Sequence, residues 1–173
     1  MRTILTLAGA SLMMEATAIA DTNITIELPR IHVAEYHRPY VAVWLAQPNH
    51  KVIANLAVWY QQHDGEEGEG KSWLKDVRQW WRRSGRKLDL PIDGISGPTQ
   101  APGIHEVSIP QGNDPFKNLP AGDYILNVEA AREVGGRELL RIPFTWPADG
   151  PITQTMSGST ELGDVTLTVD ATN

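Results

Sequence analysis

The strongest structural signal in the chain is the stretch YVAVWL, Tyr40–Leu45, in which aliphatic and aromatic residues fill every position. β-Branched and aromatic residues favour strands, and a strand that is apolar on both faces is typical of a central position in a sheet. A second run of similar composition, Val52–Tyr60, follows after the polar residues Gln47–His50, which suit a short hairpin connection. The two runs therefore predict a pair of adjacent central strands.

Further short strands are expected around this pair. Residues 123–131 alternate, with Tyr124, Leu126, Val128 and Ala130 on one face. Other strand-like segments are residues 23–28, 104–109, 137–146 and 164–170. Seven or so short strands between turns rich in Gly, Pro, Asn and Asp predict one immunoglobulin-like antiparallel β-sandwich, a single domain over residues 21–173. Residues 148–160, rich in Gly, Ser, Thr and Pro, are expected to form a mobile loop.

Residues 72–83 break the strand pattern. Their apolar side chains recur with the spacing of an α-helix: Trp73, Leu74, Val77, Trp80 and Trp81. Ser72 is a suitable cap at the start, and Gly85 is a suitable end. We therefore expect one amphipathic helix, near residues 72–83, inserted into the sandwich.

The same helix offers a candidate interaction surface made of Trp80, Trp81, Arg82 and Arg83. Two adjacent tryptophans cannot both point fully inward, so one of them could line an apolar groove. Basic residues beside them could face an anionic membrane or an acidic partner. The alternative interpretation is a tryptophan-rich core below a solvated charged face.

The N-terminal residues predict export. Arg2 precedes an apolar run over residues 4–14, and Ala18-Ile19-Ala20 is a small-x-small cleavage pattern. This order is typical of a cleavable signal peptide, here residues 1–20 with cleavage after Ala20, and it predicts a periplasmic location. The chain has no cysteine, so neither a lipid anchor at the cleavage site nor a disulfide is expected. No later segment is apolar and long enough for a transmembrane anchor.

Composition and side-chain type limit the ligands. The net charge of −6 disfavours nucleic acid, which binds clustered Lys and Arg. A divalent metal is possible, with His32, His37, His63 and Glu66 as the candidate ligands, because histidines and carboxylates are common metal ligands. The last two belong to the acidic segment His63–Glu69. The alternative is that the histidines only form hydrogen bonds and the acidic segment is a solvated loop.

Three stretches resemble a bacterial family of predicted periplasmic proteins of unknown function. They are Arg38–Trp44, Asp93–Gly97 followed by Pro102-Gly103, and Leu119–Tyr124 continuing to Glu129–Glu133. The resemblance implies export, a compact β fold and a setting beside PepSY-type membrane reductases and flavin-attaching enzymes, often linked to iron acquisition. It implies no catalytic residue.

The resemblance implies a non-enzymatic periplasmic binding or accessory protein. It would assist a membrane reductase or an iron or other metal-uptake protein, through protein contacts or a weakly bound metal. Two alternatives stay open: a metal-dependent periplasmic enzyme that uses histidine and acidic side chains, and a structural or interaction module without a ligand.

Overall fold

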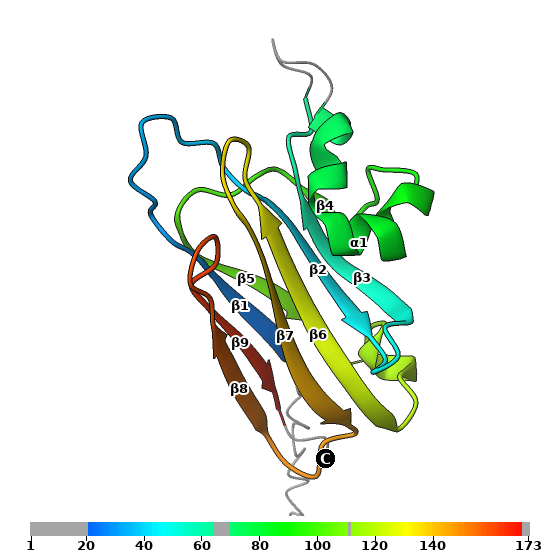
Figure 1. Cartoon of the computed structure of the whole chain (residues 1–173). Coiled ribbons are helices and arrows are strands. Elements are labelled where there is room, and N and C mark those ends of the chain that lie inside the picture. The colour runs from blue at the N-terminus through cyan, green and yellow to red at the C-terminus, as the bar shows by residue number, and fades with distance from the viewer. Residues whose placement is uncertain (1–20, 64–69, 111, 171–173) are drawn as a thin grey trace, which may run out of the picture.

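The computed structural model describes residues 21–63, 70–110 and 112–170, which form two β-sheets packed face to face (Figure 1). The first sheet has the strand order β5 (Gly103–Ile109), β1 (Thr22–Leu28), β9 (Asp164–Val169) and β8 (Ile152–Ser157). The second has the order β4 (Ser96–Gly97), β3 (Val52–Trp59), β2 (Tyr40–Ala46), β6 (Gly122–Ala131) and β7 (Arg137–Trp146). Neighbouring strands are antiparallel, except for the parallel pair β3 and β4. The predicted β-sandwich is confirmed.

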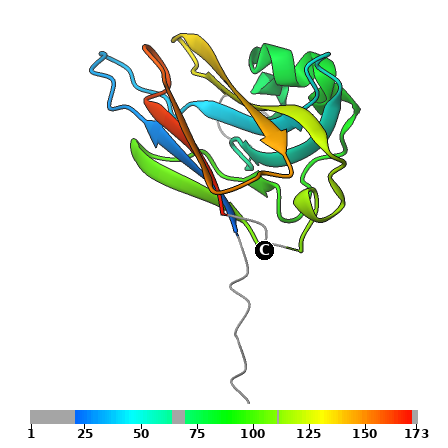
Figure 2. The same ribbon diagram turned by 90° about the horizontal axis from the view of Figure 1, so that it is seen from below.

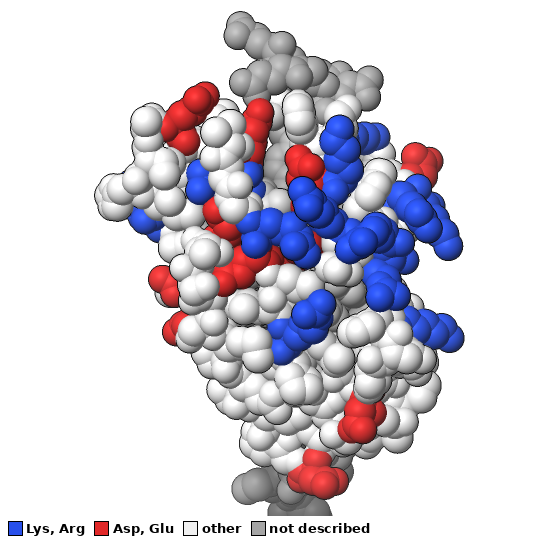
Figure 3. Space-filling model, in the orientation of Figure 1, with Lys and Arg blue, Asp and Glu red and all other residues white. Residues whose placement is uncertain are grey.

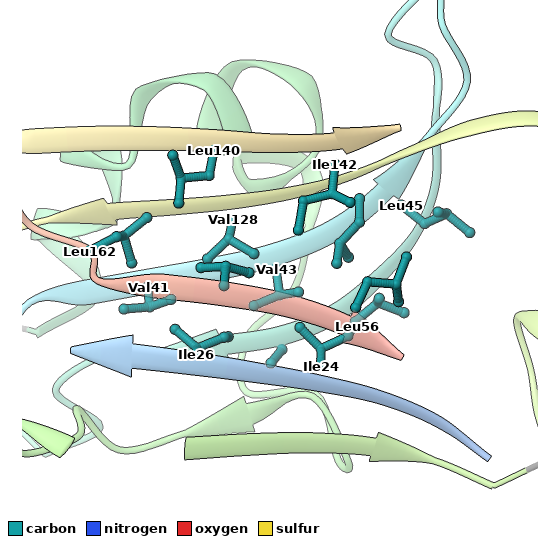
Figure 4. Close-up of a cluster of buried hydrophobic side chains, with 14 of the residues drawn as sticks. Ile24, Ile26, Val41, Val43, Leu45, Leu56, Val128, Leu140, Ile142 and Leu162 are labelled. Atoms are coloured by element: carbon teal, nitrogen blue, oxygen red, sulfur yellow. The ribbon is translucent and has the colours of Figure 1, made fainter. Parts of the chain in front are cut away.

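The main core lies between the two sheets (Figure 4). Ile24 and Ile26 of β1 are completely buried, and they face Val41 and Val43 of β2 across the interface. Alternate residues along each strand point to the same face of a sheet, which is why period-two apolar patterns fill this core. The alternation expected for residues 123–131 is confirmed, because Tyr124, Leu126, Val128 and Ala130 all belong to it.

A second apolar layer covers the outer face of the five-stranded sheet. Ala42, Trp44 and Ala46 of β2 are buried there under the helical segment, residues 70–87. Figure 2 shows this segment on the side of the sheet that faces away from the other sheet. Strand β2 is therefore apolar on both faces because each face has its own cover.

The helical segment differs from the single helix expected near residues 72–83. It consists of the 3₁₀ helix η1 (Gly70–Asp76), the α-helix α1 (Arg78–Arg83) and the 3₁₀ helix η2 (Gly85–Lys87). The break falls at Val77, whose ψ of 71° is not helical. Val77 is fully buried beside Leu74 and Trp80, so the break keeps all three on the sheet, whereas Trp73 stays 36% exposed.

Two strands lie where none was expected. The loop prediction for residues 148–160 was wrong over β8, because glycine and proline occur only around Ile152–Ser157, as Gly150-Pro151 and Gly158. Within β8 the side chains are mostly exposed, as suits an edge strand that pairs with β9 alone. Strand β4 has only two residues, too few for any periodicity to appear in the sequence.

The carboxylates of Glu138 and Glu161 hold the connections in this cysteine-free domain. The carboxylate of Glu138 accepts hydrogen bonds from the backbone N–H groups of residues 159–162, at 2.7–3.0 Å. Burial alone would raise the pKa of Glu138, but these bonds outweigh it and lower the pKa to about 2. Glu161 forms a two-pronged ion pair with Arg132, at 2.9 and 3.1 Å.

Candidate functional site: a basic face and an end cavity

A buried carboxylate places helix α1 on the sheet. Glu129 of β6 is 0% exposed, and it accepts hydrogen bonds from the backbone N–H groups of Gln79 at 3.0 Å and Trp80 at 2.9 Å. These groups belong to the first turn of α1, where N–H groups lack a partner within the helix and a negative charge is favourable. Glu129 also pairs with the Nε atom of Arg137, 2.5 Å away. The turn is therefore tied to β6 and β7 together.

Trp80 holds the other side of the helix. Its indole is 0% exposed, and its Nε1 atom donates a hydrogen bond of 2.8 Å to the side-chain oxygen of Asn55 on β3. Asn55 in turn donates to the hydroxyl of Ser84, at 2.8 Å. Because a buried indole needs a partner for its N–H, this bond fixes the ring within the layer. Trp80 was expected in an exposed interaction surface, and its complete burial shows that this part of the prediction was wrong.

Trp81 lies beside it and is only partly buried. The centroids of the two indole rings are 6.3 Å apart. Trp81 lines a shallow groove of about 450 Å³ together with Lys75, Arg78, Arg82 and Arg137. Of the two adjacent tryptophans, one therefore anchors the helix and the other reaches a basic groove.

Six exposed cations of the helical segment form what we call the basic face. They are Lys75, Arg78, Arg82, Arg83, Arg86 and Lys87. Figure 3 shows Lys and Arg gathered over this part of the molecule. Arg82 and Arg83 were expected to belong to an interaction surface, and both are exposed here. Arg137 at the edge of the groove is already paired with Glu129.

A cavity of about 260 Å³, which we call the end cavity, opens at the end of the sandwich where β3 and β6 finish and β2 begins. Its walls come from five separate parts of the chain. They are the connection into β2 with its first residue (Tyr36, His37, Arg38, Tyr40), the segment after β3 (Gln61), η1 (Trp73, Asp76), the segment after β4 (Thr99), and the end of β6 with its turn (Ala131, Glu133). The hydroxyl of Tyr40 donates a 3.0 Å hydrogen bond to the carbonyl of Gly70, which ties β2 to η1 beside the cavity.

His37 stands between two carboxylates at this cavity. Its Nε2 atom lies 3.2 Å from Glu35, and its Nδ1 atom lies 3.6 Å from Glu133. The Nε2 atom is enclosed, yet it has no partner in hydrogen-bonding geometry among the described residues. Burial is the main reason that the pKa values of the neighbouring phenols of Tyr36 and Tyr40 are raised, which keeps both groups neutral.

The predicted metal ligands are spread over different parts of the chain. His32 is exposed in the connection after β1, His63 is exposed after β3, and Glu66 lies outside the described residues. Within residues 21–63, 70–110 and 112–170, no group of three or more His, Asp or Glu side chains is arranged to hold a metal ion. A metal at His32, His37, His63 and Glu66 stays a prediction.

Other residues of the site gave no sequence signal. Tyr36, Asp76 and Glu133 meet only because separate connections converge on one end of the sandwich, and no motif or spacing joins them. Glu129 and Arg137 lie on the neighbouring strands β6 and β7, and they form an ion pair with each other.

A model of a known protein family matches most of the chain. None of the helices in the described part of the chain is apolar and long enough to cross a membrane. Neither the curated proteins nor the solved structures contain a significant match. The family model described as "Predicted periplasmic protein (DUF2271)" matches residues 21–164, which is most of the chain. The chain therefore belongs to the DUF2271 family of predicted periplasmic proteins.

Proposed function

We propose that this protein is a non-catalytic periplasmic accessory domain that docks onto an acidic surface of a partner protein through its basic face. The observation that carries the proposal is a reversal of charge. Residues 71–87 contain seven Lys or Arg and one Asp, a local charge of +6, in a chain whose net charge is −6. Such a patch attracts a negatively charged partner and orients the encounter, because the rest of the molecule is repelled.

The basic face is held rigidly. Glu129 bonds the first turn of α1, Trp80 is hydrogen-bonded to Asn55 of β3, and both side chains are buried. A surface whose backbone is fixed before binding loses less conformational entropy when a partner arrives. This preorganisation favours a specific docking surface over a merely solvated one.

The exposed side chains favour a protein partner over a lipid bilayer. The exposed large apolar residues of the described chain are Val33, Trp73, Ile104, Val134 and Met156, and of these Trp73 alone lies in the helical segment, beside Lys75. Stable attachment to a membrane surface needs apolar groups that enter the bilayer in addition to charge. The charge of the basic face is therefore better matched by carboxylates of a protein.

The identity of the partner follows from the resemblance and not from the geometry. A membrane reductase or an iron or metal-uptake protein is the partner that the resemblance implies. The same proposal includes export with cleavage after Ala20. It is supported by a family match that begins at residue 21, directly after the cleavage pattern. The intact mass of the protein purified from periplasm checks this cleavage, and a mass that retains residues 1–20 would contradict it.

The docking proposal is tested with a charge-reversal variant. Residues 21–173 carrying Arg78→Glu, Arg82→Glu and Arg83→Glu are compared with the unchanged protein in cross-linking and pull-down from solubilised envelope. We expect an acidic membrane reductase or uptake component to be captured by the unchanged protein, less at high salt, and lost in the variant. Surface charges interact over about 10 Å at 0.1 M salt, so added salt weakens such docking.

A matched control changes the net charge equally at other sites. Arg30→Glu, Lys51→Glu and Lys117→Glu reverse three exposed cations outside the helical segment. This variant should retain the partner. Equal loss in both variants, or capture that salt does not weaken, would contradict docking through the basic face. Binding to anionic vesicles in place of a protein would refute a protein partner and support the membrane alternative.

A further inference from the structure

We propose that the end cavity binds an organic cation, an ammonium or guanidinium group carried by a small molecule or by a Lys or Arg side chain. This site adjoins the basic face, because Lys75 of that face lies over the ring of Trp73, but it takes a ligand of the opposite charge. Its volume of about 260 Å³ is several times the roughly 30 Å³ that one water molecule occupies in the liquid. The space therefore suits a charged group of several heavy atoms.

Three aromatic side chains line the cavity: Tyr36, Tyr40 and Trp73. Aromatic faces attract cations within about 6 Å of the ring centre. Rings at this end already do so within the protein. The guanidinium of Arg132 lies 5.8 Å from the ring of Tyr36, and the ammonium of Lys75 lies 5.5 Å from the ring of Trp73. Two of the aromatic rings that line the cavity therefore already form cation–π contacts within the protein.

Two carboxylates add charge to these walls. Asp76 and Glu133 both line the cavity, and neither forms an ion pair with a Lys or Arg among the described residues. Arg38 is the one Lys or Arg among the lining residues. The lining carboxylates therefore outnumber the lining Lys and Arg, so the site favours a cation over an anion.

An organic cation fits this arrangement better than a metal ion does. A calcium ion takes six to eight converging oxygen ligands, whereas the described residues provide no group of three ligands for a metal. An ammonium or guanidinium group spreads its charge over several atoms and is satisfied by aromatic faces and a few carboxylates. Tyr36 and Tyr40 are neutral at pH 7, as ordinary phenols are, and burial raises the pKa of each further.

The test uses residues 21–173 and three probes: choline, its neutral isostere 3,3-dimethyl-1-butanol, and Nα-acetyl-arginine amide. Binding is followed in NMR titrations by the ring signal of Tyr36, a lining residue that is kept in every variant. We expect one or both cations to shift this signal saturably, and the neutral isostere to leave it unchanged. Saturable binding of choline alone indicates a small quaternary ammonium ligand, and tighter binding of the arginine derivative indicates a side chain of a partner.

Variants locate the site. Glu133→Gln, Asp76→Asn and Trp73→Leu should each weaken cation binding by about fivefold or more, since each removes one charge or one ring face. Glu106→Gln on β5 is the control and should bind normally, because Glu106 is exposed and does not line the cavity. All four side chains are exposed, so the variants should fold. Equal shifts from choline and the neutral isostere, no binding of either cation at tens of millimolar, or unchanged binding in all three variants would overturn the proposal.

Discussion

The carboxylate of Glu129 lies 2.9 Å from the backbone nitrogen of Trp80, a residue 49 positions earlier in the chain. This contact links the sheet directly to the helical segment that carries the basic face, as the hydrogen bond between Trp80 and Asn55 also does. The segment supplies no side-chain cap of its own to α1, so the start of that helix depends on a residue of another element.

Replacing this carboxylate should loosen the helical segment. Glu129→Gln keeps the shape but removes the charge shared by Arg137 and two backbone N–H groups. We expect the free energy of unfolding to fall by about 2–3 kcal/mol, since a buried, charge-assisted network is broken on one side. Urea unfolding followed by tryptophan fluorescence measures the loss. A change no larger than that of Glu106→Gln would show that Glu129 does not hold the helix.

Glu138 should make the stability depend on acid pH. Its pKa is lowered from 4.5 to about 2 in the folded state, so its contribution is present above pH 4.5 and is lost as the pH falls through 2. At pH 7, Glu138→Gln should lower the free energy of unfolding by about 1–2 kcal/mol, because solvent screens part of the effect at this partly exposed carboxylate. Urea unfolding of both proteins at a series of pH values should show the difference shrinking between pH 4.5 and 2. A difference that is constant over this range would contradict the assignment.

Gly85 should not tolerate a side chain. A Cβ atom at this position would lie 2.5 Å from the indole ring of Trp80. Gly85→Ala should therefore lower the free energy of unfolding by about 2 kcal/mol and disturb the near-ultraviolet circular dichroism of the tryptophans. Gly150→Ala is the matched control, because its Cβ would meet nothing within 4 Å. If the two variants were equally stable, the close packing of Trp80 on Gly85 would be refuted.

Removing one partner of the Arg132–Glu161 ion pair should destabilise the protein strongly, whereas replacing both partners with apolar residues should destabilise it less than the single changes would suggest. Their side chains are only 6% and 4% exposed, and Arg132→Met leaves the Glu161 carboxylate buried without its partner. We expect the single substitution to cost about 3 kcal/mol, and the double variant with Glu161→Leu to cost less than the two single changes together. Thermal and urea unfolding of the unchanged protein, the two single variants and the double variant give a double-mutant cycle. Strict additivity would mean that the pair contributes no coupling.

The sheets could be predicted from the sequence because burial on one face imposes a period of two. Strand β6 shows this alternation, and its inward residues Tyr124 and Leu126 are in the core as expected. Strand β8 was missed because an edge strand with exposed side chains has little apolar pattern to detect. The break at Val77 was missed because it depends on the shape of the sheet below the helix, which no local pattern describes.

The candidate site could be predicted only in part. The exposure of Arg82 and Arg83 could be expected because neighbouring charges are visible in a linear chain, and their role in an interaction surface stays a prediction. Trp80 and Trp81 could not be told apart, since the choice depends on Asn55, a residue of another strand. The end cavity could not be foreseen, because residues such as Tyr36 and Glu133 meet only after both sheets and η1 have formed.

The position of strand β2 between two apolar layers affects how the domain unfolds. The strand contributes Val43 to one apolar layer and Trp44 to the other, so both layers share the same backbone. Detachment of the helical segment would expose a whole face of the central strand to water, which couples local opening to global unfolding. By thermodynamic linkage, a ligand on the basic face then raises the melting temperature of the entire domain. Occupancy of that surface would thus prolong the lifetime of the domain among periplasmic proteases.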